Sequence, residues 1–542
     1  MANIPRKENP DMPLSLCLAL YLSLLLLINA AVDSKPITSC AQTPYPATCE
    51  SYMGKTVLSS LEEDSNAMVA FHRAALRVAM DQAVEVRRLV ATMDVSSFGG
   101  RARSAWSDCL ELYDDAVYHL NRSMGLRTVG SADSQTWLSA AVTSDVTCRD
   151  GLKEMSLESQ LLRYFPNVVM TSFSELLSNS LAVNRANAAA TPSGRGRRRL
   201  MSTVTGGGFP SWVSYSDRKL LVSDAAADIV VAKDGSGDFE TISEAVAAAS
   251  SRRSGDRRFV IHVKAGTYDE HVEITRSMRN LMIVGDGMDA TVVVGSRNAG
   301  SGGQQTFGTA TFAVTGDGFF ARGMTFVNTA GPQNHQAVAL RSGSDLSVFY
   351  SCSFKGYQDT LYVYTQRQFY RDCDVYGTVD FIFGNAVAVL QNCNIYPRKP
   401  MSGQMNTLTA QGRTDPNQNT GIVLHGCRIT ATSDLRSAGG SVKTYLGRPW
   451  QKYSRTVVMK STIDSVIDPK GWAPWSGSFA LSTLYYGEYL NSGAGAGTGG
   501  RVQWPGYHPD MSASDAGKFT VGDFLAGDSW IPGTGVPFSA GL

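Results

Sequence analysis

The chain has 542 residues, of which 43% are hydrophobic and 18% are charged, and this length predicts more than one folded domain. Its 49 basic and 48 acidic side chains nearly cancel, so charge gives no support for binding to nucleic acid or to an acidic membrane surface. The 52 glycines and the low charged fraction exclude a coiled coil and favour a turn-rich β protein over part of the length.

The first segment, residues 1–32, begins with basic residues, continues with an apolar run and ends near small residues. This pattern is typical of a secretory signal peptide, although an apolar run of this length also fits an uncleaved membrane anchor. We expect a cleaved signal. No later stretch is long and apolar enough to span a bilayer, so the remaining chain is expected outside the cytosol.

Residues 33–190 have a helical pattern. Apolar residues such as Met68, Phe71, Ala75 and Val78 recur mostly at three- and four-residue steps, and similar spacing returns twice downstream. The pattern predicts a bundle of about four amphipathic helices, with Cys40 and Cys49 clipping an N-terminal hairpin. Four cysteines lie in each half of the chain after the leader, and their number alone leaves the pairing open.

The segment 191–227 is rich in glycine and basic residues and has no apolar period, so we expect an exposed linker. It contains two basic clusters, Arg197–Leu200 (RRRL) and Arg218–Leu221 (RKLL). Two interpretations remain open on chemistry alone. The segment is either an ordinary solvated connection or a site of proteolytic processing, near Arg199–Leu200 or within Arg218–Leu221.

From residue 228 to 542 the sequence consists of short β runs separated by Gly, Asn and Asp. A phrase of the form apolar-x-x-Cys/Ser-x-apolar recurs with its centre at Cys352, Cys373, Cys393, Cys427 and Ser461. Repeats of about 20 and 34 residues indicate a solenoid whose longer coils carry extra loops on one side. Continuous apolar runs favour a parallel β-helix over a sandwich, and loops on one side build a groove that suits an extended polymer.

Two neighbouring repeats each contain an aspartate among aromatic residues, Asp359 in GYQDTLYVY and Asp380 in YGTVDFIFGNA. They lie 21 residues apart, so one coil would stack them on the same face at about 5 Å. Two acids this close do not both ionise freely, and acid-plus-nucleophile chemistry needs such a pair. The alternative is a pair of turn aspartates that bond their own backbone.

Further polar and aromatic residues accompany these acids. Gln336 and Gln358 lie about one coil apart and offer amide donors for an oxyanion, although glutamine ladders are also common solenoid packing. Arg448 and Trp450 combine a cation, which would keep Asp380 ionised, with a ring that can stack on a sugar.

Several motifs are absent. The sequence has no GxSxG, so a serine-esterase elbow is missing, and it has no CxxC or HExxH and no dense acidic cluster for calcium, so we expect no metal site. Asn121 in Asn-Arg-Ser is the one candidate glycosylation site.

The phrases GTYDE (266–270), HQAVAL (335–340), YQDTLY (357–362), GTVDFIFGNA (377–386) and LGRPW (446–450) occur in this order and resemble plant pectin methylesterases. The resemblance covers most of residues 228–542. It implies an all-β right-handed parallel β-helix that hydrolyses methyl esters of polygalacturonate without a cofactor, acting as a secreted monomer in the cell wall.

Residue by residue, the resemblance implies that Asp380 is the nucleophile, Asp359 the acid and then the base, and Arg448 the partner of Asp380. It implies that Gln358 and Gln336 bind the oxyanion, and that Thr306 and Trp450 contact substrate. We expect Tyr362, Phe383 and Trp475 to line the groove. The resemblance also implies a Cys373–Cys393 bridge between adjacent coils.

The N-terminal half resembles the pro-region similar to pectin methylesterase inhibitors, an all-α four-helix bundle. This implies bridges Cys40–Cys49 and Cys109–Cys148, and a bundle that restrains the enzyme until a processing protease cleaves at RRRL or RKLL. A bundle that only assists folding remains an alternative. The implied partners are pectin, the chain's own pro-region and separate inhibitor proteins.

Two other functions are weighed against the esterase. A polysaccharide lyase or glycosidase on the same solenoid would also use a groove with paired acids. A non-catalytic inhibitor or wall-binding protein would use only the helical half, but the intact Asp359, Asp380 and Arg448 argue against it.

Overall fold

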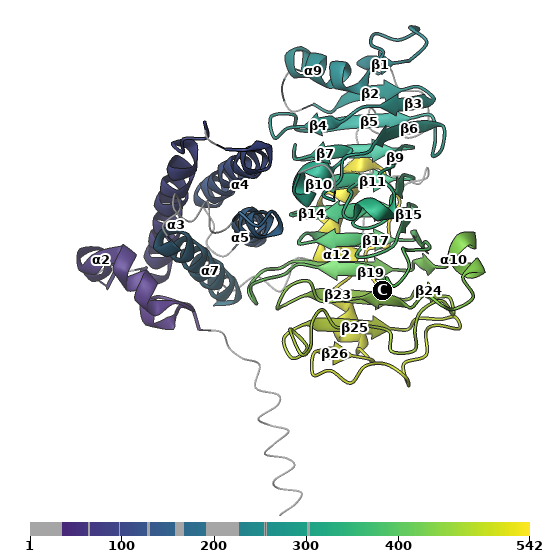
Figure 1. The fold of residues 1–542 in the computed structure, drawn as a ribbon. Helices are drawn as coiled ribbons and strands as arrows, with labels where there is room; N and C mark the ends of the chain where they lie inside the picture. Colours follow the sequence, from purple (N-terminus) through teal and green to yellow (C-terminus); the bar gives the residue numbers. More distant parts are fainter. Residues whose placement is uncertain are drawn as a thin grey trace, which may run out of the picture.

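The computed structural model describes residues 35–190 and 227–542, apart from 63–65, 97, 127–130, 158–166, 254, 256 and 301–303. Within these residues the chain forms a helical bundle and a β-helix that lie side by side (Figure 1). The expected leader and both basic clusters of the linker lie outside the described residues. None of the described helices is long and apolar enough to cross a membrane.

The bundle contains the expected amphipathic helices. Its elements are η1 (Cys40–Gln42), α2 (Pro46–Glu62), α3 (Ala67–Ala91), α4 (Gly100–Met124), α5 (Ala132–Glu154) and α7 (Asn167–Ala190). Side chains of Asn66 and Ser131 cap α3 and α5 by accepting from the backbone N–H groups of Val69 and Ser134. Helix α2 lies on the side of the bundle away from the β-helix (Figure 1).

The predicted helical spacing holds in α3 for Phe71 and Ala75, which are buried, whereas Met68 and Val78 are only partly buried. The buried face continues through Ala79 and Val86. Helix α5 differs, because residues on nearly every face of it are buried. One of its faces packs in the bundle, and another packs against the β-helix.

Both disulfides expected in this half are present. The Cys40–Cys49 bridge joins η1 to α2, and the Cys109–Cys148 bridge joins α4 to α5.

The second unit is a parallel β-helix built from three sheets. The largest sheet contains β1 (Ile229–Val231), β2 (Phe259–Val263), β5 (Leu281–Gly285), β8 (Phe320–Arg322), β11 (Ser347–Tyr350), β14 (Arg367–Arg371), β17 (Val387–Gln391), β20 (Gly421–His425), β23 (Arg455–Met459), β25 (Tyr485–Tyr489) and β26 (Tyr507–His508). The second contains β3 (Gly266–Asp269), β6 (Thr291–Gly295), β9 (Thr325–Asn328), β12 (Ser353–Lys355), β15 (Asp374–Gly377), β18 (Asn394–Pro397), β21 (Arg428–Ile429) and β24 (Thr462–Ile463).

The third sheet is the one that faces the bundle. It contains β4 (Val272–Ile274), β7 (Phe312–Val314), β10 (Leu340–Ser342), β13 (Leu361–Val363), β16 (Ile382–Gly384), β19 (Asn406–Gln411) and β22 (Thr444–Gly447). Ala313, Tyr362, Phe383 and Ala410 from this sheet belong to the same buried apolar cluster as the core of the bundle. The bundle therefore packs directly on this sheet.

Short helices complete the β-helix. Helix α9 (Ile242–Arg252) packs at the N-terminal end, and α11 (Ala513–Gly517) and α12 (Val521–Phe524) cover the outer face of the largest sheet. The remaining turns are α10 (Ser433–Ser437), η2 (Thr306–Thr309), η3 (Pro332–Asn334), η4 (Gly527–Ser529) and η5 (Ile531–Thr534).

The repeated phrase forms one corner of the solenoid. Its central residues follow β11, β14, β17, β20 and β23, where the chain passes from the largest sheet to the second. The residue before each centre has a positive φ of 51° to 62°. The same left-handed turn therefore bends the chain in each of these coils, and the parallel pairing confirms the solenoid.

The predicted Cys373–Cys393 bridge is wrong, because Cys352, Cys373, Cys393 and Cys427 are all buried free thiols. Coils in register point equivalent side chains in the same direction, so the thiols stack along the corner rather than bond to one another. The thiol of Cys373 instead lies 3.3 Å from the carbonyl oxygens of Phe349 and Arg371.

Candidate active site

The two predicted acids occupy equivalent places in successive coils. Asp359 lies two residues before β13 and Asp380 two residues before β16, and these strands pair with Leu361 opposite Ile382. Both acids have left-handed backbones, with φ of 63° and 52°. Aspartate tolerates this conformation better than most residues, and here it turns both carboxyl groups toward the same groove. The structure thus confirms that one coil separates them.

Asp380 is held by a charged and a neutral donor. The Arg448 guanidinium donates to both carboxylate oxygens, from Nε at 2.8 Å and from Nη2 at 2.7 Å. Thr407 Oγ1 donates to Asp380 Oδ1 at 2.6 Å and accepts from the Asp380 N–H at 2.9 Å. A bidentate arginine favours the ionised carboxylate and fixes its plane. Asp380 is therefore an oriented anion, as a nucleophile must be.

Asp359 has the opposite character. Burial raises its pKa well above the ordinary value, the charge of Asp380 raises it further, and Glu154 of the bundle adds to this. Arg448 lowers the pKa of Asp359, but less than these effects raise it. Asp359 therefore keeps its proton beside an ionised Asp380, which is the division of roles that general acid catalysis requires.

A groove of about 560 Å³ brings together every substrate-site residue predicted from the sequence. Its lining includes Thr306, Gln336, Gln358, Asp359, Tyr362, Asp380, Phe383, Arg448, Trp450 and Trp475. Tyr362 and Phe383 stack with ring centroids 4.2 Å apart, and the Trp450 ring meets Phe383 edge-on at 6.0 Å. The guanidinium of Arg448 lies 4.3 Å from the Trp475 ring. Flat rings beside an acid pair suit the binding of sugar rings.

The C-terminal part of helix α5 also lines this groove. The carboxylate of Glu154 accepts from Thr306, at 3.1 Å from its backbone N–H and 2.8 Å from its hydroxyl. Gln451 Nε2 donates to Asp150 Oδ2 at 2.9 Å. Gly151 lies so close to Gln305 that a Cβ there would come within 1.4 Å of the glutamine oxygen. The bundle therefore occupies the groove beside the acid pair.

Sequence reasoning missed some of these residues. Thr407 lies 27 residues after Asp380 in a longer coil, so its position beside Asp380 has no regular spacing that could reveal it. Asp150, Gly151 and Glu154 reach the groove only because the bundle packs against the third sheet. The predicted glycosylation site, Asn121, is exposed on α4 and is not part of the groove lining.

Comparison with known proteins gives a match for each half of the chain. A family model described as Pectinesterase matches residues 228–528. The chain belongs to the pectinesterase family. A second model, described as Plant invertase/pectin methylesterase inhibitor, matches residues 36–183, so this pectinesterase has an inhibitor-like N-terminal region.

Individual relatives agree with both matches. Pectinesterase 2 of Citrus sinensis is 51% identical over 505 residues, covering 93% of this chain and 94% of its own. Probable pectinesterase/pectinesterase inhibitor 17 of Arabidopsis thaliana is 53% identical with the same coverage. The solved structure of pectin methylesterase from carrot is 56% identical with a TM-score of 0.58, and it covers 59% of this chain and 99% of its own.

Proposed function

We propose that the β-helix hydrolyses methyl esters of homogalacturonan in pectin, releasing methanol and leaving pectate, with Asp380 as nucleophile and Asp359 as acid and base. The observation that carries this proposal is the pairing of two states in one groove. Asp380 is an anion held in a bidentate contact with Arg448, and Asp359 next to it has a raised pKa. A nucleophile and a proton donor are then both available at the same pH.

The first half of the reaction forms an acyl-enzyme. The Asp380 carboxylate attacks the ester carbonyl carbon, and the amide groups of Gln336 and Gln358 donate to the oxyanion that develops. The carbon–oxygen bond to the methoxy group then breaks, and Asp359 gives its proton to that oxygen. Methanol leaves, and an anhydride joins Asp380 to the galacturonate.

The second half restores the enzyme. Asp359, now a carboxylate, takes a proton from water, and the hydroxide attacks the acyl carbon of the galacturonate. The anhydride breaks, Asp380 leaves as a carboxylate in its contact with Arg448, and Asp359 is protonated again. Thr306 and Trp450 hold the sugar chain along the groove that they line.

The test is methanol release from highly methylated pectin after the linker has been cut and the bundle removed. Asp380→Asn should lower the rate by roughly 10³-fold or more, because the covalent step is lost. The control is Asp372→Asn, the same change at a residue with a similar φ of 52° that does not line the groove. Full activity in Asp380→Asn contradicts the assignment. Shortened pectin chains without methanol would instead indicate a lyase or glycosidase.

We also propose that the bundle inhibits the enzyme within the same chain. Glu154 occupies the hydroxyl and N–H of Thr306, a predicted substrate contact, and Asp150 occupies Gln451 beside Trp450. These two carboxylates are charged and do not resemble the neutral methyl ester of the substrate. Their helix fills the space in the groove that a polymer would need. Methanol release by the intact chain should therefore be low, and removal of the bundle should raise it.

Processing and location complete the proposal. We propose that the protein is secreted to the cell wall and that a protease cuts the linker at RRRL or RKLL within residues 191–227. Separate inhibitor proteins with the same helical fold would then compete for the groove that the bundle leaves. Mass spectrometry of the secreted protein identifies the new N-terminus, and a terminus outside 191–227 would contradict this step.

A further inference from the structure

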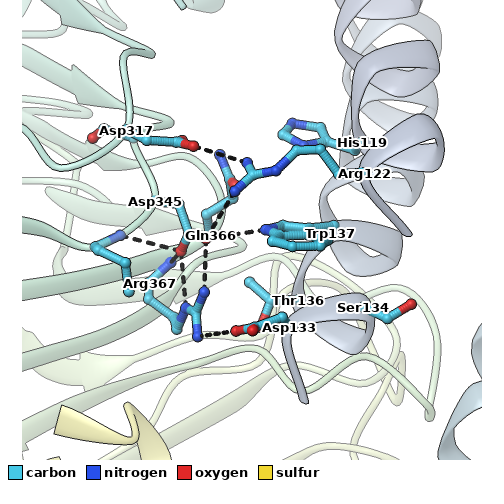
Figure 2. Close-up of polar contacts among 12 residues, drawn as sticks. His119, Arg122, Asp133, Ser134, Thr136, Trp137, Asp317, Asp345, Gln366 and Arg367 are labelled. Atoms are coloured by element: carbon cyan, nitrogen blue, oxygen red, sulfur yellow. Dashed lines mark hydrogen bonds and ion pairs between the residues drawn. The ribbon is translucent and has the colours of Figure 1, made fainter. Parts of the chain in front are cut away.

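A second set of contacts joins the two units away from the groove (Figure 2). We call it the Asp345 anchor. It consists of Arg122, Asp133 and Trp137 of the bundle and of Asp317, Asp345 and Arg367 of the β-helix. None of these residues lines the groove.

Asp345 is the centre of the anchor and is 1% exposed. Arg367 donates to both of its oxygens, from Nε at 2.9 Å and from Nη2 at 2.8 Å. From the bundle, the Trp137 indole N–H donates to Asp345 Oδ2 at 3.1 Å. Burial by itself raises the pKa of Asp345, but the charge and hydrogen bonds of Arg367, with Arg122 and Trp137, bring it down to about 2. Asp345 is thus a buried anion shared by both units.

Arg122 is the bundle's cation in this cluster. Its Nη1 lies 3.0 Å from Asp317 Oδ2 and its Nη2 lies 3.8 Å from Asp345 Oδ2. The guanidinium also stacks on the Trp137 ring, 4.0 Å from the centroid. In the other direction, Arg367 Nη1 of the β-helix donates to Asp133 Oδ1 of the bundle at 2.7 Å. Each unit therefore supplies both a cation and an anion, so the two surfaces are complementary in charge.

The anchor and the acid pair lie at opposite ends of the third sheet's strands. Asp359 and Asp380 precede β13 and β16, whereas Asp317 and Asp345 follow β7 and β10. Helix α5 connects the two places, because Trp137 lies near its start and Gly151 near its end, about 20 Å apart at 1.5 Å per residue. The anchor fixes one end of the helix whose other end occupies the groove.

A loop of the β-helix adds further contacts that do not involve the acid pair. Gln135 Nε2 of α5 donates to the Asn417 carbonyl at 2.7 Å, and Gln418 Nε2 donates to the Ser139 carbonyl at 3.1 Å. Arg185 of α7 donates to the Pro416 carbonyl at 2.7 Å. These contacts, like the anchor, are independent of the covalent connection through residues 191–226.

From these contacts we infer that the Asp345 anchor is a docking site that retains the bundle after the linker is cut, so that cleavage and activation are separate steps. The inference rests on the proposed inhibition by the bundle and names the surface that controls it. The occupant of this site is the chain's own bundle, which presents Arg122 stacked on Trp137 to the acids of the β-helix. The anchor must break before the groove opens to pectin.

The experiment uses the full chain with a recognition sequence for a site-specific protease placed in the linker. After cutting, gel filtration measures whether the two fragments elute together, and methanol release measures whether the groove is open. The cut wild-type chain should elute as one complex with methanol release unchanged. Arg122→Ala should weaken retention at least tenfold, since it removes the ion-pair partner of the buried Asp317 and one of the two cations beside Asp345, and methanol release should rise accordingly.

Two further variants separate the anchor from general damage. Arg77→Ala removes the same charge from an exposed position of the bundle and should leave retention as in the wild type. Asp317→Asn removes the Arg122 ion pair from the β-helix side, outside the groove, and should weaken retention as well. Both changes break the same ion pair, between Arg122 and Asp317. The double variant Arg122→Ala/Asp317→Asn should therefore lose less affinity between the fragments than the sum of the two single losses.

Two results overturn the inference. One is a cut wild-type chain that separates at once into free fragments. The other is retention in Arg122→Ala and Asp317→Asn equal to that of the wild type. Co-elution does not depend on catalysis. If the cut Arg122→Ala variant separates into fragments while the cut wild type does not, but the free β-helix releases no methanol, then the proposed esterase is wrong and the anchor still stands.

Discussion

In the proposed reaction Thr407 is a positioning residue, because its hydroxyl bridges the backbone and the carboxylate of Asp380. Thr407→Val removes a hydrogen bond to a charged group, which contributes about 1.5 to 3 kcal/mol, so kcat should fall about tenfold or more. KM should not change, since Thr407 does not line the groove. Steady-state methanol release checks this.

The matched control is Thr409→Val on the same strand, where the hydroxyl donates to the Leu446 carbonyl and not to an acid. An equal loss of kcat in both variants would mean that the effect is structural rather than specific to the nucleophile.

The raised pKa of Asp359 predicts how the stability of the folded protein depends on pH. Burial and Asp380 raise this pKa in the folded state, so as the pH rises above about 4, Asp359 ionises in the unfolded chain before it ionises in the folded protein. The stabilising effect of the bound proton is present below that pH and is lost progressively as the pH rises toward the folded-state pKa. Asp359→Asn, which is neutral throughout, should therefore gain stability over the wild type as the pH increases.

Thermal unfolding of both proteins between pH 4 and pH 7 measures this difference. A constant gap in Tm across that range would show that Asp359 is not protonated in the folded protein.

At the scale of elements, helix α5 carries the proposed inhibition, and Gly151 is where it approaches the groove most closely. Replacing this glycine by leucine should favour the helix by about 1 kcal/mol, yet the new side chain would collide with the buried Gln305. Gly151→Leu should therefore stabilise α5 and at the same time push it out of the groove. We expect methanol release by the uncut chain to rise severalfold.

Gly100→Leu at the start of α4 is the control, because nothing lies within 4 Å of the position of its Cβ. Activity that rises equally in both variants, or in neither, would argue against inhibition through α5.

The elements also show what sequence could predict. The repeated phrase predicted the solenoid corner, because each phrase contains one turn and the strands beside it, and the 21-residue step placed Asp359 and Asp380 in adjacent coils. The Cys373–Cys393 bridge was predicted wrongly, since register decides which cysteines are neighbours but not whether their sulfurs face each other. The contact between Arg122 and Asp345 was missed because they lie 223 residues apart and no local pattern in either segment indicates that the two meet.

The whole molecule has its two disulfides in the bundle and free thiols in the β-helix, among the residues that the structure describes. The Cys109–Cys148 bridge spans 39 residues, and such a loop stabilises a fold by about 3 to 4 kcal/mol. A mild reductant should therefore lower the unfolding temperature of the bundle by about 10 °C and leave that of the β-helix unchanged. At temperatures where the reduced bundle is unfolded and the β-helix is still folded, the uncut chain should release methanol without any proteolysis. Scanning calorimetry and methanol release, each with and without reductant, measure both effects. A reductant-dependent shift in the β-helix transition would instead indicate a bridge among its four buried cysteines.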